Sequence, residues 1–206
     1  MTTILYQHPL SGHSHRVRLM LALLNIKATI YDVDLMTGEH KAPEFLAKNA
    51  AGQVPVLEDG EHTLSDSNAI LVYLATRHDP SGHWYPEEPV RRAKIQKFLS
   101  IAAGPVASGP AAARLVNVFG AGLDMENAKN VATTILGQLN DHLADNSWLA
   151  GSDPTIADVA NYAYIAHAPE GDVSLAPYAH VTRWLAQIEA LPGFVPMVST
   201  EVGLAA

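Results

Sequence analysis

A proline-rich segment near the middle of the chain divides the sequence into two parts with different residue patterns. Asp79–Pro89 (DPSGHWYPEEP) contains three prolines and one glycine and follows neither helical nor strand periodicity. Before this segment, patterns typical of short strands and helices alternate, whereas after it the periodic stretches are helical. We therefore predict an α/β domain at residues 1–78, a linker at 79–89 and an all-α domain at 90–206.

The α/β domain is predicted to have the order strand, helix, strand, short helix, β-hairpin and helix. Asp59-Gly60 supplies the hairpin turn, and Pro43 suits the first turn of the short helix. Ser14 is expected to cap the first long helix through its hydroxyl. The expected elements are Thr3–Tyr6, a helix from Ser14 onward, Ala28–Asp34, Ala42–Lys48, Gln53–Glu58, His62–Leu64 and Asp66–His78.

The all-α domain is predicted to contain one long, bent helix followed by three further helices. Glycine–proline pairs at residues 104–105 and 109–110 are expected to break or bend the long helix. Thr155 and Asp158 have the spacing of a capping box, which satisfies free amides at a helix start, so we assign them to folding rather than chemistry. The expected helices are Val90–Phe119, Asp124–Ala144, Thr155–Ala168 and Tyr178–Leu191.

Composition excludes several classes of function. The 206 residues carry a formal net charge of −8, which disfavours a nucleic-acid partner because phosphate binding needs clustered cations. The chain has no cysteine, so a disulfide, a thiolate zinc site and a protein-thiol mechanism are excluded, and any sulfur chemistry must come from a ligand. The histidines, His13 and His15 among them, lack a metal-ligand pattern, so we assign no metal. Apolar stretches too short for a membrane predict an unexported, cytoplasmic protein.

The dipeptide Val54-Pro55 marks an unusual backbone site, because proline removes a hydrogen-bond donor yet here begins a predicted strand. If the bond is cis, it turns the Val54 amide and carbonyl out of the sheet, where they can pair with the backbone of a peptide ligand. The alternative is a trans proline on an edge strand.

Two further positions place polar groups at helix starts. Asp66-Ser67 opens a helix, so the backbone amides and the Ser67 hydroxyl can hold a carboxylate while Asp66 accepts an ammonium group; plain N-capping is the alternative. Ser11 lies just before the first long helix, where a hydroxyl and the helix dipole can stabilise an anion such as a thiolate. Here a simple loop serine, or Ser14 in its place, is the alternative.

These residues occur in the order of a known family. The motifs Tyr6–Ser11, Gly38–Leu46, Gly52–Leu57, Asp66–Ile70 and Pro154–Asp158 together resemble a bacterial glutathione S-transferase, of a serine-type or beta-like class without the catalytic cysteine. The resemblance covers nearly the whole chain. It implies a thioredoxin-like α/β N-terminal domain that binds glutathione and an all-α C-terminal helical bundle that forms the electrophile pocket.

The resemblance also implies roles for individual residues. Val54, before the family's cis-proline Pro55, would pair with the cysteinyl part of glutathione, and Asp66 and Ser67 would hold its γ-glutamyl end. Ser11 matches the hydroxyl of serine-type classes, with Tyr6, Ser14 or backbone donors as alternatives for activating the thiol. The remaining expected contacts are Gln53 and Lys41 to glutathione, with Lys41 meeting the glycyl carboxylate or simply solvated, and Ser108, Arg114 and Asn117 in the electrophile pocket or in surface and interhelix roles.

The implied activity is conjugation of the glutathione thiolate to small hydrophobic electrophiles, as in detoxification, by a homodimer. The same site could instead serve a glutathione-dependent peroxidase, disulfide reductase, dehalogenase or isomerase. A non-catalytic carrier or scaffold of the same fold is a third interpretation, because fold alone does not fix function. The identity of the electrophile cannot be read from an apolar pocket that has no motif.

Overall fold

The computed structural model describes residues 2–206 and divides the chain into two compact units. The α/β unit contains the chain up to Gly82 together with Pro192–Val198, and the helical unit contains His83–Leu191 and Ser199–Ala206. The division at Gly82 falls inside the predicted linker. The predicted fold class, a thioredoxin-like α/β domain followed by an all-helical domain, is confirmed.

The α/β unit is built on a four-stranded sheet with the order β2-β1-β3-β4. β1 pairs parallel with β2 and antiparallel with β3, and β3 and β4 form the predicted hairpin. β3 is shorter than its sequence pattern indicated and begins after Pro55, which has no amide to donate to a ladder. The strands are β1 (Thr3–Gln7), β2 (Thr29–Asp32), β3 (Val56–Asp59) and β4 (His62–Ser65).

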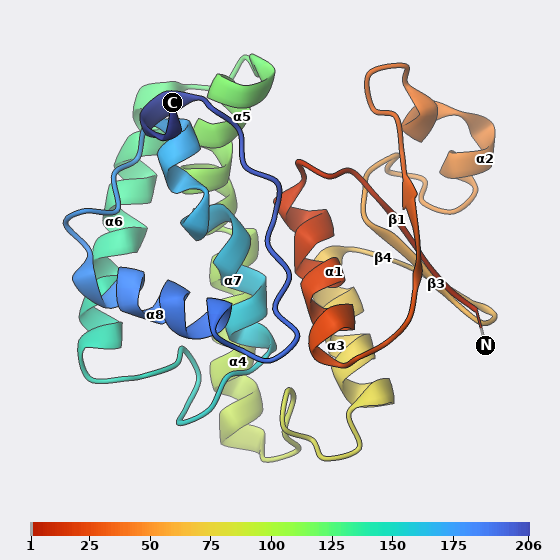
Figure 1. Cartoon of the computed structure of the whole chain (residues 1–206), viewed down its shortest axis with the longest axis horizontal. Helices are drawn as coiled ribbons and strands as arrows, with labels where there is room; N and C mark the ends of the chain where they lie inside the picture. The colour runs from red at the N-terminus through yellow and green to blue at the C-terminus, as the bar shows by residue number, and fades with distance from the viewer. Residues whose placement is uncertain (1) are drawn as a thin grey trace. The chain divides into compact units, whose positions relative to one another are not determined.

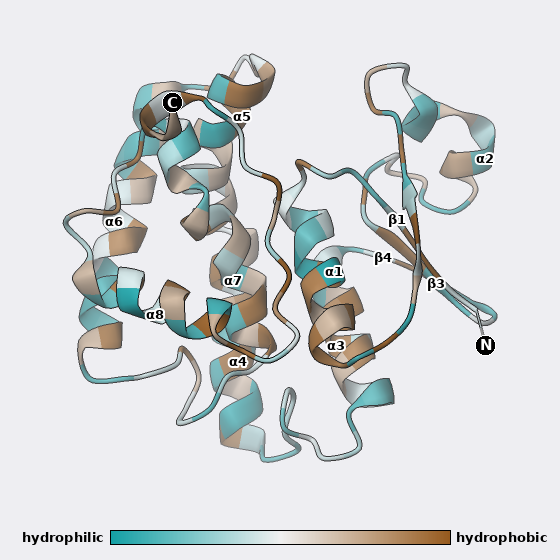
Figure 2. Ribbon diagram, viewed as in Figure 1, coloured by the Kyte–Doolittle hydropathy of each residue, from teal (hydrophilic) through white to brown (hydrophobic). Residues whose placement is uncertain are grey.

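Helices cover both faces of this sheet. α1 (Gly12–Leu23) and α3 (Ser67–His78) lie side by side on one face, and the short α2 (Pro43–Leu46) lies on the other (Figure 1). Phe45 of α2 packs in a small cluster with Val33 and Val56. The first turns of α1 are hydrophilic and its C-terminal part is hydrophobic (Figure 2), so polar groups gather at the start of the helix and apolar burial occurs further along it.

The first long helix begins earlier than the sequence pattern indicated. Ser11, not Ser14, is the N-cap of α1, and its Oγ accepts the Ser14 amide at 3.2 Å. Ser14 is fully buried, and its Oγ accepts the His8 amide at 3.2 Å. The predicted capping role of Ser14 was therefore wrong, because Gly12 and His13 adopt helical geometry ahead of it.

The segment that follows the last long helix returns to the α/β unit, which no local pattern indicated. His15 of α1, 3% exposed, is hydrogen-bonded through Nε2 to the Val195 carbonyl at 2.8 Å. Gly193 adopts a φ of 88°, and an added Cβ would lie 3.0 Å from the Ala22 carbonyl oxygen. A side chain at this position would therefore press on the end of α1.

The helical unit contains the predicted bent helix as separate pieces. The chain leaves α4 at Ala103, passes through a π-helical turn at Ala107–Ala111 and continues as α5, so both glycine–proline pairs interrupt the helix as predicted. Gly109 permits a close approach, because an added Cβ would lie 2.8 Å from the Ala132 amide nitrogen. The helices are α4 (Pro89–Ala103), α5 (Ala112–Phe119), α6 (Met125–Ala144), α7 (Ile156–Ala166) and α8 (Ala179–Glu189), with 3-10 turns at Glu39–Lys41, Ala168–Gly171 and Gly203–Ala205 along the whole chain.

α7 is the buried centre of the helical unit, and its capping box is present as predicted. The Asp158 carboxylate accepts hydrogen bonds from the Thr155 amide and hydroxyl, the Leu149 amide and the Trp184 indole. Burial raises the pKa of Asp158, although these four bonds favour the charged form. No helix in residues 2–206 is long and apolar enough to cross a membrane.

Candidate functional site

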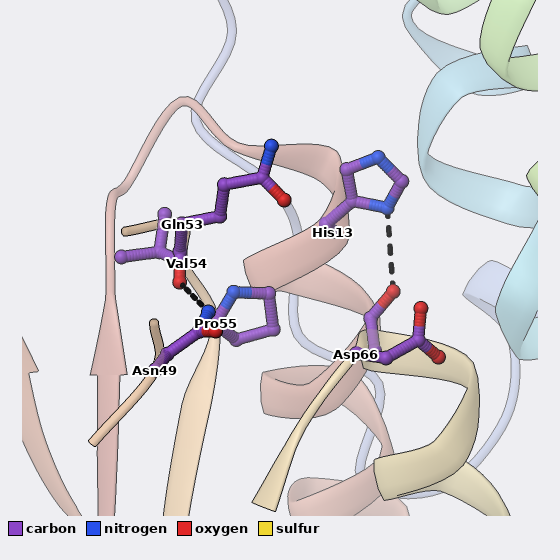
Figure 3. Close-up of a pocket in the computed structure, with 7 residues that line it drawn as sticks. His13, Asn49, Gln53, Val54, Pro55 and Asp66 are labelled. Atoms are coloured by element: carbon purple, nitrogen blue, oxygen red, sulfur yellow. Dashed lines mark hydrogen bonds between the residues drawn. The ribbon is translucent and has the colours of Figure 1, made fainter. Parts of the chain in front are cut away.

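A small, mostly polar cavity lies in the α/β unit where the chain enters β3 and where α1 and α3 begin. Its volume is about 100 Å³. Figure 3 shows residues from three places in the chain converging on it: the first turn of α1, the segment before β3 and the start of α3. Five of the predicted glutathione contacts are therefore together in one place. The lining residues are His13, Asn49, Gln53, Val54, Pro55, Asp66 and Ser67.

The segment before β3 is held in place by two polar side chains. Asn49 Nδ2 donates to the Gln53 carbonyl at 2.8 Å, a bond drawn in Figure 3. Lys41 Nζ donates to the Ala51 and Gly52 carbonyls at 3.3 and 3.1 Å. Lys41 is exposed and does not line the cavity, so in this structure its ammonium group fixes the backbone that leads to the cavity.

The Val54-Pro55 peptide bond is cis, and both residues line the cavity. Val54 is half-buried and Pro55 is buried, whereas Gln53 is exposed. The cis geometry agrees with the first of the two interpretations of this dipeptide.

Asp66 and Ser67 form the start of α3, as predicted. Asp66 is the N-cap, with a φ of 69°, and its Oδ1 accepts the Ala69 amide at 2.8 Å. A positive φ is uncommon for a residue with a side chain, although aspartate and asparagine adopt it more readily than most. Asp66 is exposed and Ser67 is 4% exposed. The positive end of the helix dipole and a hydroxyl therefore lie at the cavity beside an accessible carboxylate.

Two side chains of α1 reach the Ser67 hydroxyl. Arg16 is 1% exposed, and its Nη1 donates to Ser67 Oγ at 2.9 Å and to Asn68 Oδ1 at 3.0 Å. His13 Nδ1 lies 3.3 Å from Ser67 Oγ. Burial and the Arg16 guanidinium lower the pKa of His13 to about 4, against the opposing effect of the Asp66 carboxylate. His13 is therefore neutral at physiological pH, and the buried Arg16 brings the positive charge.

Ser11, the predicted catalytic residue, lies at the start of α1 and is half-buried, but it does not line the cavity. Its Oγ accepts the Ser14 amide, so the hydroxyl keeps its proton for another acceptor. Of the alternatives, Ser14 is fully buried and bonded to the His8 amide. The Tyr6 phenol donates to Glu58 Oε2 at 3.1 Å. Within residues 2–206, Ser11 is the one of these three hydroxyls that is partly exposed and donates to no other protein group.

The three residues predicted for the electrophile pocket do not lie together. Ser108 lines a separate cavity of about 520 Å³ within the helical unit, and its hydroxyl donates to the Gly104 carbonyl at 3.1 Å. Arg114 is 1% exposed and donates through Nε to Glu170 Oε2 at 2.6 Å, and Asn117 donates to the Glu170 carbonyl at 3.1 Å. These two side chains therefore contact the interior of the helical bundle.

Sequence reasoning did not assign His13, Asn49 or Arg16 to the site. His13 was considered only as a metal ligand, although its place two residues after Ser11 puts it in the first turn of a helix. Asn49 precedes an Ala-Ala-Gly stretch, and an Asx side chain before a turn is a signal for a backbone hydrogen bond. Arg16 has no local signal, because its partners Ser67 and Asn68 lie 51 and 52 residues away.

Two family models match this chain. One is described as the N-terminal domain of glutathione S-transferase and matches residues 1–76, and the other, its C-terminal domain, matches residues 123–192. Glutathione S-transferase 2 of Anopheles gambiae is 31% identical over 196 residues, covering 94% of each chain. Maleylacetoacetate isomerase of Rhizobium meliloti is 34% identical over 184 residues, covering 84% of this chain and 85% of its own.

Solved structures agree with these matches. A glutathione S-transferase from Pseudomonas fluorescens superposes with a TM-score of 0.89 at 29% identity, covering 97% of this chain and 100% of its own. A glutathione transferase homologue from Drosophila mojavensis, solved with bound glutathione, has a TM-score of 0.85 at 28% identity and covers 93% of this chain and 89% of its own. The chain belongs to the glutathione S-transferase family, which uses glutathione as a substrate.

Proposed function

We propose that the protein is a glutathione transferase that conjugates the glutathione thiolate to small hydrophobic electrophiles. The observation that carries this proposal is the cavity of the α/β unit, which gathers the Val54 backbone, Asp66 and Ser67 at the start of α3. A zwitterionic amino-acid end and a peptide backbone are the two features that such a cavity suits. Glutathione carries both.

In the proposed complex, the γ-glutamyl carboxylate receives hydrogen bonds from Ser67 and the α3 amides, while Asp66 accepts from the γ-glutamyl ammonium group. The Val54 amide and carbonyl pair with the cysteinyl part, and Gln53 adds a polar contact beside it. Lys41 is exposed, and it remains the candidate for the glycyl carboxylate. Asn49 supports the site by holding the Gln53 carbonyl.

The chemistry requires the glutathione thiol to lose its proton near neutral pH. Ser11 donates its hydroxyl proton to the sulfur, and the start of α1 adds the positive end of a helix dipole, so the thiolate is stabilised and the thiol pKa falls. The thiolate electron pair then forms a bond to an electrophilic carbon. In a substitution the leaving group departs with its electron pair, and in an addition the neighbouring carbon takes a proton.

The pocket for the electrophile is formed, in this proposal, by the helical domain. Ser108 is the best supported of the three predicted residues, since it lines a cavity there, whereas Arg114 and Asn117 contact Glu170. Homodimerisation, a cytoplasmic location and a role in detoxification belong to the same proposal and follow from the family resemblance.

A conjugation assay tests the proposal. The purified protein is incubated with glutathione and an activated aryl chloride, and the thioether is measured by absorbance and mass spectrometry. We expect catalysis by the native protein, a turnover about 10- to 100-fold lower for Ser11→Ala, and a glutathione affinity that changes much less. Absence of thioether with every electrophile class, together with no glutathione binding, would favour the carrier or scaffold interpretation.

Glutathione-dependent isomerisation is a second candidate, and the similarity to the Rhizobium meliloti protein named maleylacetoacetate isomerase supports it. The same thiolate would add to a conjugated cis double bond, permit rotation about the resulting single bond and leave again as the trans product forms. Glutathione is then regenerated instead of consumed. Measuring free thiol after turnover of a cis-enedione distinguishes the two activities, because conjugation consumes one thiol per product.

A further inference from the structure

The Ser67 hydroxyl oxygen is contacted by Arg16 and by His13. Whether His13 donates a hydrogen bond to this oxygen or accepts one from the hydroxyl decides whether the hydroxyl proton is available to a ligand. Arg16 Nη1 lies 2.9 Å from Ser67 Oγ. A guanidinium has no acceptor, so this bond always runs from Arg16 to the hydroxyl oxygen. One acceptor position of Oγ is therefore occupied, and the hydroxyl proton points elsewhere.

His13 determines where that proton goes. Its Nδ1 lies 3.3 Å from Ser67 Oγ, the second dashed bond in Figure 3, and a neutral imidazole can either donate or accept through this atom. If Nδ1 is bare, it takes the Ser67 proton and withdraws it from the cavity. If Nδ1 carries the proton, Oγ accepts from both His13 and Arg16, and the hydroxyl proton is left for a ligand.

We propose that His13 is a positioning residue: its Nδ1–H tautomer donates to Ser67 Oγ and, with Arg16, directs the Ser67 hydroxyl proton toward the γ-glutamyl carboxylate. This inference rests on the proposed function for the identity of the ligand. A bound carboxylate favours this tautomer, because a hydroxyl bonds an ionised acceptor more strongly than a neutral imidazole nitrogen. His13 thus acts through Ser67 and needs no contact with glutathione.

The charges around His13 fit this role. The Arg16 guanidinium and the Asp66 carboxylate both act on the pKa of His13, and burial and Arg16 together keep the ring neutral. A neutral ring orients the hydroxyl without adding a charge beside Asp66, which the proposal assigns to the ligand's ammonium group. The γ-glutamyl carboxylate of the ligand is then also attracted by the positive charge of the buried Arg16, which lies behind Ser67.

Calorimetric titration of glutathione into a matched set of variants tests the inference. Leucine at position 13 removes the donor, whereas asparagine keeps one, because its Nδ2 lies as many bonds from Cα as the histidine Nδ1. We expect His13→Leu to weaken glutathione binding about 3- to 10-fold and His13→Asn to stay within about twofold of the native protein. Thermal unfolding of each variant checks that the fold is kept.

A double-mutant cycle then locates the effect at Ser67. In a Ser67→Ala background, His13→Leu should cause no further loss of affinity. A glutathione analogue that lacks the γ-glutamyl α-carboxylate should bind native protein and His13→Leu equally. Both results would assign the effect of His13 to the hydroxyl and the carboxylate that it bonds.

Three results would overturn the inference. They are a His13→Leu variant that binds as well as or better than the native protein, a loss that persists in the Ser67→Ala background, and a His13→Asn variant as weak as His13→Leu. The failure of the proposed function looks different. In that case the native protein itself fails to bind glutathione, and the inference falls with it.

Discussion

Two buried polar clusters, one in each unit, differ in where their hydrogen bonds lead. In the α/β unit, Arg16 and His13 converge on Ser67, and Ser67 lines a cavity. In the helical unit, Asp158 is 1% exposed and receives its bonds from the interior of the protein, including the Trp184 indole at 2.9 Å. We propose that the first cluster orients a hydrogen-bond donor for a ligand, whereas the second holds the start of α7. Burial alone therefore does not indicate function.

The closed cluster should have the largest effect on stability. Asp158→Ala removes the acceptor of buried donors on Thr155, Leu149 and Trp184, and each donor left without a partner costs about 1–3 kcal/mol. We expect a loss of at least about 3 kcal/mol in the free energy of unfolding, measured by urea denaturation.

Asp153→Ala is the matched control, since its side chain is 52% exposed and surface changes have small effects. The comparison between the clusters also predicts that protein folded despite Asp158→Ala binds glutathione with native affinity. A stable Asp158→Ala variant with weakened binding would reverse the roles given to the two clusters.

A second buried cluster in the helical unit, centred on Glu170, is expected to make the stability of the protein depend on pH. Burial raises the pKa of Glu170, but bonds from His167 and the Thr200 amide and the charge of Arg114 outweigh it, so the pKa is lowered overall. Glu170→Gln also removes the carboxylate that neutralises a buried guanidinium, and we expect a loss of about 3 kcal/mol at pH 7.

The sign of the pH effect follows from the lowered pKa. The stability that the Glu170 carboxylate supplies is fully present above its ordinary pKa of 4.5 and is lost as the pH falls through its lowered pKa. The difference in unfolding free energy between native protein and Glu170→Gln should therefore narrow on acidification from pH 7 to pH 3. A difference that is constant over this range would contradict the assignment.

Two glycine positions, one in each unit, are expected to respond in opposite directions to substitution by alanine. Gly52 comes directly before the cavity-lining residues Gln53 and Val54 and has a φ of 57°. An added Cβ would lie 2.8 Å from both the His40 carbonyl oxygen and Lys41 Nζ. Gly52→Ala should cost about 1–3 kcal/mol and weaken glutathione binding, because the backbone leading to Val54 must shift.

Gly137 in α6 is the contrasting position, since an added Cβ would meet nothing within 4 Å. Gly137→Ala should stabilise the protein by about 0.5–1 kcal/mol, because alanine loses less backbone entropy in a helix, and should leave glutathione binding unchanged. Calorimetric melting and glutathione titration of both variants check the pair. Equal effects on binding would show that the segment before Val54 does not shape the site.

Features that depend on neighbouring residues could be predicted from the sequence. The capping box of Thr155 and Asp158 spans three residues, and the interruption of the long helix follows from proline and glycine chemistry. The same holds for the position of Asp66 and Ser67 at the start of α3, because a helix N-terminus is a local signal. The fold class followed from periodicity combined with the family resemblance.

Features that depend on distant contacts could not be predicted. His13 and Ser67 are 54 residues apart, and Arg114 and Glu170 are 56 apart, so no spacing connects them. The position of Arg114 near a helix bend suggested that its side chain lines a pocket. In the structure its guanidinium is instead paired with Glu170 inside the helical bundle. The assignment of the α1 cap to Ser14 was wrong for a related reason, since either serine satisfies the local pattern and only the start of the helix distinguishes them.

We propose that Ser11 lowers the thiol pKa of glutathione bound in the α/β unit. The most direct measurement is the ultraviolet absorbance of the thiolate as a function of pH, for glutathione saturating the native protein, Ser11→Ala and Ser14→Ala. This role of Ser11 predicts a thiol pKa well below that of free glutathione in the native protein and an unlowered pKa with retained binding in Ser11→Ala. The same lowered pKa in native protein and Ser11→Ala would contradict it.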